Sequence, residues 1–181
     1  MDQAIVHSTT FKGNQLTMAA GLATLSVFDD EGVVDHAAAM GRLWRANLEA
    51  LAERHQFLHE VRGRGQTIGV VFGAPSSRGA RLRWRAIESA RPAMFSQTIV
   101  VPLFHRYGIL TQVAADNVNV IKLLPPLIAD VSEIEYFVGA LDELLCDAER
   151  NSAWLREFGV TMARGRLKPT RTANSTMVVA T

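Results

Sequence analysis

Cysteine, lysine and long apolar runs are all scarce in this chain of 181 residues. Cys146 is the one cysteine, which excludes an intrachain disulfide and favours a reducing compartment such as the cytoplasm. No apolar run approaches the roughly 20 residues that a membrane-spanning helix needs, so we expect no membrane partner. The N-terminus, Met1-Asp2-Gln3, has no basic region followed by an apolar one, and we expect no signal peptide.

The charge balance is nearly even, with a formal net charge of +1, so no global field attracts nucleic acid or an anionic membrane. Arginine is nevertheless concentrated between residues 78 and 91. A basic cluster can bind nucleic acid, but this one contains a single aromatic residue, Trp84, and no repeated base-stacking pattern. We therefore expect no nucleic-acid partner and favour a solvated arginine face or a contact with another part of the protein.

Hydrophobic residues make up 48% of the chain and charged residues 20%, which is typical of a globular α/β protein with one core. Apolar periodicity and turn residues predict helices over 14–29, 33–55, 94–107 and 132–149, and strands over 67–72, 109–113 and 118–124. Ser132 and Glu135 have the spacing of a capping box. A short docking helix near Trp154 and a mostly disordered tail from Lys168 to Thr181 are also expected.

A glycine-rich segment, Val61-Arg62-Gly63-Arg64-Gly65, precedes the first expected strand. Its glycines suit a turn or bulge at the entry to a sheet. A phosphate-cradling loop is the alternative, but the segment lacks the Lys-Ser/Thr end of a P-loop. We favour the structural interpretation.

Hydroxyls and a glycine precede the first expected helix, in His7-Ser8-Thr9-Thr10-Phe11-Lys12-Gly13-Asn14. Asn14 is a good N-cap, and Thr9 and Thr10 lie just ahead of the positive end of the helix. Such hydroxyls and free backbone N–H groups suit an anion, most simply a phosphate. A capping turn without a ligand is the competing interpretation.

Three segments occur in order: HSTTFKGNQLTMAAGLATL, EVRGRGQTIGVVF and NVIKLLPPLI. Together they resemble the C-terminal part of class III aminotransferases, the pyridoxal-phosphate (PLP) enzymes that include ornithine and acetylornithine aminotransferase. The resemblance runs from about His7 to about Leu145. It implies the small domain of a fold-type I PLP enzyme, with a short sheet covered by helices and a protruding N-terminal helix. The implied organisation is a phosphate-motif segment and bridging helix over 1–30, the small domain over 31–149, and a C-terminal helix and tail over 150–181.

The resemblance also implies roles for individual residues. Thr10, with Thr9 beside it, matches the threonine that binds the PLP phosphate of the neighbouring subunit. Lys12 replaces a family glycine and is expected to be exposed. Lys122 occupies a position where the family often has an arginine that grips the substrate α-carboxylate. A lone charge in that apolar strand needs a partner, either a substrate or an acidic residue. Because lysine lacks the bidentate fork of arginine, the substrate stays open between α-amino acids, ω-amines and larger amino compounds.

PLP chemistry requires a lysine that holds the cofactor as a Schiff base. The chain has three lysines, Lys12, Lys122 and Lys168, and none matches that position. In the resembled family the lysine lies upstream, on the large domain. We therefore expect the C-terminal portion of an aminotransferase for an amino donor and an oxo acid, inactive alone, cytoplasmic, and working as a homodimer or with a large domain. The alternatives are a non-catalytic dimerisation or interaction module, or part of an aminomutase on the same scaffold.

Overall fold

The computed structural model describes residue 10 and residues 13–150. In this part of the chain, five helices accompany a four-stranded sheet: α1 (Gln15–Asp30), α2 (Val33–Arg54), β1 (Leu58–Arg64), β2 (Thr67–Phe72), α3 (Arg78–Glu88), α4 (Met94–Tyr107), β3 (Gln112–Val113), β4 (Val120–Leu123) and α5 (Val131–Arg150). The predictions for Thr9, Lys12, Lys168, the helix near Trp154 and the tail lie outside the described residues. None of the described helices has both the length and the apolar character needed to cross a membrane.

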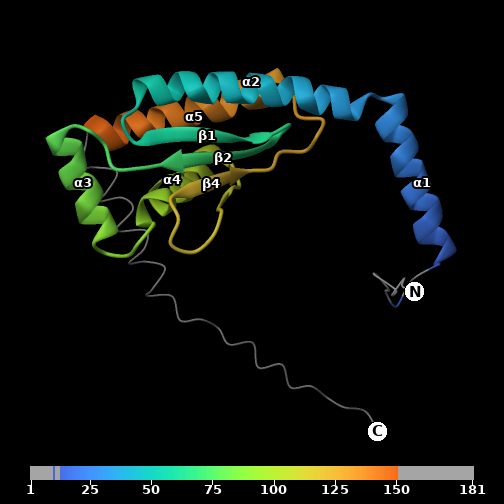
Figure 1. The fold of residues 1–181 in the computed structure, drawn as a ribbon, viewed down its shortest axis with the longest axis horizontal. Coiled ribbons are helices and arrows are strands. Elements are labelled where there is room, and N and C mark those ends of the chain that lie inside the picture. Colours follow the sequence, from blue (N-terminus) through green and yellow to red (C-terminus); the bar gives the residue numbers. More distant parts are fainter. Residues whose placement is uncertain (1–9, 11–12, 151–181) are drawn as a thin grey trace, which may run out of the picture.

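The sheet has the order β1-β2-β4-β3, and all neighbouring strands are antiparallel. The central pair joins Ile68 to Leu123 and Val70 to Ile121, and these side chains share one face of the sheet. That face is buried beneath helices: α2 packs on β1 and β2, while α4 packs on β3 and β4 (Figure 1). Helix α5 packs against both α2 and α4. The predicted α/β fold is confirmed, with a short sheet covered by helices.

An aromatic cluster joins the helices to the buried face of the sheet. The ring of Phe95, on α4, stacks on Phe57 with centroids 4.8 Å apart and lies 5.5 Å from Phe72 on β2. Trp84 of α3 completes the cluster, 4.8 Å from the Phe95 ring. Aromatic pairs at these separations gain stability beyond the area they bury. The cluster therefore seats α3 and α4 on the sheet.

Helix α4 begins and ends where its neighbours satisfy the free backbone groups. The Glu88 carboxylate accepts hydrogen bonds from the backbone N–H groups of Ala93 (2.9 Å) and Phe95 (3.0 Å). At the other end Gly108 adopts a positive φ of 67° and closes the helix, as predicted. Pro102 lies inside the helix and is buried.

Helix α1 protrudes from the rest of the molecule (Figure 1). Asn14 caps it as predicted, because its side-chain oxygen accepts from the Thr17 backbone N–H at 3.1 Å. The polar break that follows contains Gly32, whose φ of 60° suits a residue without a Cβ. No residue of α1 is buried, and its large apolar side chains are exposed: Leu16, Met18, Leu22, Leu25 and Val27. The predicted protruding helix is therefore confirmed.

The structure places the expected turn of 61–65 at the end of this segment and shows that the rest of it is a strand. Most of this segment belongs to β1, a strand at the sheet edge that is polar and largely exposed. The sequence of β1 does not resemble that of a buried strand, because an exposed edge strand needs few apolar residues. The turn begins at the last residue of the segment, Gly65, which has a φ of 53° between β1 and β2.

The predicted capping box of α5 is also wrong by two residues. Asp130, not Ser132, caps the helix: its carboxylate accepts from the Ser132 backbone N–H (2.7 Å) and hydroxyl (2.8 Å). Glu133 completes the box by accepting from the Asp130 backbone N–H at 2.9 Å. The Ser132 backbone hydrogen bond, followed by those from its hydroxyl and from Glu133, lowers the pKa of the Asp130 carboxyl. Asp and Ser cap almost equally well, so sequence alone did not choose between them.

Candidate functional site

Lys122 lies on the sheet face that the helices leave open. Because paired residues in an antiparallel sheet point to the same side, the registers place four residues in one row: Arg62, Gly69, Lys122 and Gln112. The flanking residues of β4 are buried, whereas Lys122 is half-buried. The charge therefore stands on the open face while its strand stays anchored in the core.

The backbone around Lys122 is held on both sides. Its carbonyl accepts a hydrogen bond from the Thr111 hydroxyl at 2.5 Å, and its strand pairs with both β2 and β3. Gly69 stands beside it without a side chain, and a Cβ there would lie 3.4 Å from a Val120 methyl and 3.6 Å from the Arg62 side chain. Because Gly69 has no side chain, the sheet surface next to Lys122 is not covered at this position.

No side chain among the described residues forms a hydrogen bond or ion pair with the Lys122 ammonium. An internal carboxylate partner, which the sequence left open, is therefore not present in this part of the chain. A half-buried lysine whose ammonium has no partner among the described residues favours an anion that binds from outside.

A groove of about 590 Å³ adjoins this row at the sheet edge. Gln112, which pairs with Lys122, contributes to its wall, as do Arg91 before α4 and Asp116 in the turn after β3. Polar groups therefore continue from the open face into a concavity large enough for a small molecule. The sequence assigned Arg91 to a solvated arginine face and singled out neither Gln112 nor the groove, because both depend on strand register.

Thr10 lies in an exposed turn before α1, as far as the described residues extend towards the N-terminus. The side chain of Asn14 satisfies the Thr17 N–H, and the first-turn N–H groups of Gln15 and Leu16 face outward from an exposed helix end. The N-terminal end of α1 lies far from the sheet that carries Lys122 (Figure 1). The structure therefore does not bring Thr10 and Lys122 into one site within this chain.

This combination, an antiparallel sheet with helices on one face and a projecting bridging helix, is the small-domain architecture of fold-type I aminotransferases. The chain superposes on the ω-transaminase from Pseudomonas jessenii, solved in complex with PMP, with a TM-score of 0.63. That match has 23% sequence identity and covers 83% of this chain and 30% of the other. It shows the fold.

Sequence comparison gives the family. The model of aminotransferase class-III matches residues 2–145. The diaminobutyrate–2-oxoglutarate aminotransferase of Rhizobium meliloti is 37% identical over 140 residues, which is 75% of this chain and 28% of the relative. The acetylornithine aminotransferase of Mycobacterium leprae is 33% identical over 140 residues, 77% of this chain and 29% of the relative. The chain belongs to the class III aminotransferase family, whose cofactor is PLP, and it spans less than a third of the length of these relatives.

Proposed function

We propose that this chain is the C-terminal portion of a PLP-dependent aminotransferase and forms the substrate-side wall of its active site. The observation that carries the proposal is Lys122, a half-buried residue on the open sheet face whose ammonium has no partner among the described residues. The reaction is the transfer of an amino group between an amino donor and an oxo acid. The relatives named above support this reaction class.

Among the described residues, only groups that suit the phosphate of the cofactor are present. Thr10 and the exposed start of α1 offer a hydroxyl and backbone N–H groups, which suit a phosphate dianion. Lys122 is the one lysine among the described residues, and it stands on the sheet, far from that helix end. Thr10, with Thr9, would therefore hold the phosphate of a cofactor bound mainly by another subunit. When bound, PLP supplies the electron sink for amino transfer.

Lys122 would bind and orient the substrate. An ammonium on a fixed strand attracts a carboxylate as a point charge, and Gly69 leaves room beside it for the rest of the molecule. The groove beyond Gln112 extends the same surface. These features suit a substrate longer than a simple α-amino acid, with its anionic end at Lys122.

The proposed organisation places residues 1–30 between subunits and residues 31–149 in the small domain, followed by the segment 150–181. A homodimer or a large domain would cover the apolar side of α1. We place the protein in the cytoplasm, as the single cysteine and the metabolic relatives suggest.

A chimera tests the proposal. The C-terminal segment of the Rhizobium meliloti enzyme would be replaced by residues 1–150 of this chain, and bound PLP and amino transfer would be measured. The expected result is a dimer that retains PLP and transfers amino groups. Retention of PLP without any amino transfer, over a broad set of amines and oxo acids, would contradict the proposed function.

A second candidate is a non-catalytic dimerisation module derived from such an enzyme. The largely exposed apolar side of α1 favours it, because this surface needs a partner whether or not chemistry follows. An active chimera would exclude this candidate, whereas a folded, PLP-loaded but inactive chimera would support it.

A further inference from the structure

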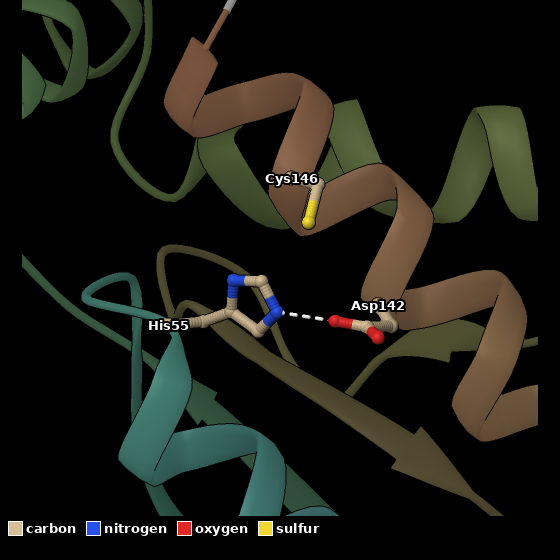
Figure 2. Close-up of side chains that lie close together, drawn as sticks. All are labelled: His55, Asp142 and Cys146. Atoms are coloured by element: carbon tan, nitrogen blue, oxygen red, sulfur yellow. Dashed lines mark hydrogen bonds and ion pairs between the residues drawn. The ribbon is translucent and has the colours of Figure 1, made fainter.

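A cluster of metal-binding side chains lies on the helix side of the molecule, away from the open sheet face. His55 follows the C-terminus of α2, and Asp142 and Cys146 lie one turn apart on α5 (Figure 2). One ligand atom from each residue lies within 4.8 Å of the others. The spacing of four along α5 presents the carboxylate and the thiol to the same imidazole.

The imidazole is the buried member of the cluster. His55 is 4% exposed, and its Nε2 lies 2.5 Å from Asp142 Oδ1. Its Nδ1 is buried without a hydrogen-bond partner, with Glu149 Oε2 the nearby acid at 3.5 Å. A buried ring nitrogen that has only this long contact with an acid, and no hydrogen bond, is costly unless another state of the site uses it.

Both carboxylates are already oriented by their outer oxygens. Arg54 contacts Asp142 Oδ2 at 3.3 Å, which leaves Oδ1 directed at His55. The backbone N–H of Gln56 donates to Glu149 Oε1 at 2.8 Å, which leaves Oε2 facing the ring. This is the arrangement of a metal centre whose ligands are held by a surrounding layer of hydrogen bonds.

We propose that His55, Asp142 and Cys146 bind one divalent cation of the zinc class, with Glu149 as the positioning residue for the imidazole. One nitrogen, one carboxylate oxygen and one thiolate form a donor set that suits Zn²⁺ or Co²⁺ and disfavours Mg²⁺ and Ca²⁺. The carboxylate and thiolate neutralise the dication. Three protein ligands leave a fourth position for water, which the partly exposed Asp142 and Cys146 make accessible.

Proton movements follow from this geometry. The Cys146 thiol loses its proton to solvent on binding the cation. The imidazole coordinates the cation through an Nε2 that carries no hydrogen, so its remaining hydrogen lies on Nδ1, where it donates to Glu149. The short Nε2–Oδ1 contact then opens to admit the cation. Binding would thus satisfy the buried Nδ1 and tie the end of α2 to α5.

Cobalt provides a direct test because Co²⁺ bound to a thiolate shows charge-transfer absorption in the near ultraviolet. The reduced, tag-free full chain would be titrated with Co²⁺ and then with Zn²⁺. The expected result is a band that saturates at one equivalent and is displaced by Zn²⁺. Zinc should also raise the melting temperature, since a ligand of the folded state stabilises it.

Substitutions assign the band to this cluster. Cys146→Ser should abolish it, and His55→Gln should weaken Co²⁺ binding at least 100-fold. Glu149→Gln should weaken binding roughly 10–100-fold and leave the band in place, as expected for a positioning residue. His105→Gln is the matched control: its imidazole is exposed on α4, outside the cluster, and binding should not change.

The proposal is overturned if excess Co²⁺ gives no thiolate band, or if His55→Gln retains the band and the affinity. Should His55→Gln unfold, Cys146→Ala decides, because a half-buried thiol can be truncated without a charged group being lost. Loss of the zinc-induced rise in melting temperature in Cys146→Ala supports the site, and its persistence contradicts it.

Discussion

The backbone of Lys122 is fixed by its strand pairing, whereas its ammonium has no partner among the described residues. A substitution at this position therefore tests whether the side chain binds the substrate. In the chimera or a complete enzyme, Lys122→Arg should raise the ratio of kcat/KM for an α-amino acid over an ω-amine. The guanidinium offers a planar fork that matches a carboxylate, whereas the ammonium is a point charge. Steady-state kinetics on both substrates measure the ratio, with Lys122→Met as the control that should weaken both. A ratio unchanged by arginine would mean that Lys122 does not meet the substrate.

Thr10 is the second residue that we propose to bind an anion, in this case the phosphate of PLP. In the same complete enzyme, Thr10→Ala should weaken PLP retention, since one charge-assisted hydrogen bond is worth roughly 1.5–3 kcal/mol. Dialysis against a PLP-free buffer, followed by absorbance, measures the loss, and Thr10→Ser should restore most of it. Equal retention in all three proteins would reduce Thr10 to part of a helix-capping turn.

Tyr107 makes stability depend on pH at the alkaline end. Burial, followed by the hydrogen bond that its hydroxyl donates to Glu143 at 2.6 Å, raises the pKa of Tyr107 to about 12 from 10.0. The folded state then holds the proton more tightly than the unfolded state. Its contribution is complete below pH 10 and is lost as the pH rises towards 12. Denaturant unfolding at intervals across this range should show the loss, and Tyr107→Phe should flatten it. An equally steep decline in Tyr107→Phe would assign the effect to other groups.

At the scale of elements, the backbone of α2 approaches the backbone of the β1–β2 turn closely at Gly41. A Cβ at Gly41 would lie 2.2 Å from the carbonyl oxygen of Gly65. Helix propensity favours alanine over glycine by about 1 kcal/mol, but the displaced backbone costs more. Gly41→Ala should therefore destabilise the fold, as measured by the denaturant midpoint.

Gly139 on α5 is the matched control for that substitution. A Cβ there meets nothing within 4 Å, so Gly139→Ala should stabilise the fold by roughly 0.5–1 kcal/mol. Stabilisation by both alanines would mean that α2 can move off the turn without loss.

The elements also show what sequence could and could not predict. Helix α5 was recognisable because its buried residues repeat at helical spacing, and β2 because it is rich in β-branched residues. Strand β1 was missed because its pairing with β2, not its own composition, makes it a strand. The row that joins Lys122 to Gln112 depends on the register of two strands. The cluster around His55 depends on the packing of two helices that are distant in the sequence. Neither can be predicted from the sequence. The resemblance named Lys122; only the structure shows its neighbours.

At the scale of the whole molecule, α1 determines how the isolated chain behaves. Its large apolar side chains are exposed, Leu22 by 67% and Leu25 by 63%. We expect the isolated chain to self-associate, which light scattering measures, and Leu22→Glu with Leu25→Glu should shift it towards monomer. Leu82→Glu on α3, also at an exposed leucine, should not. A monodisperse monomer of the unmodified chain would contradict the expectation.

The central ladder of the sheet pairs β2 with β4, although α3 and α4 lie between them in the chain. During synthesis, α2 and the β1–β2 hairpin leave the ribosome before the strand that completes the sheet and the helix that packs on α2. Contacts between such distant segments form slowly, and uncovered apolar faces bind whatever is near. Between the synthesis of β2 and that of α5 the nascent chain therefore carries a half-built core, and α5 is the last of the described elements that this core needs.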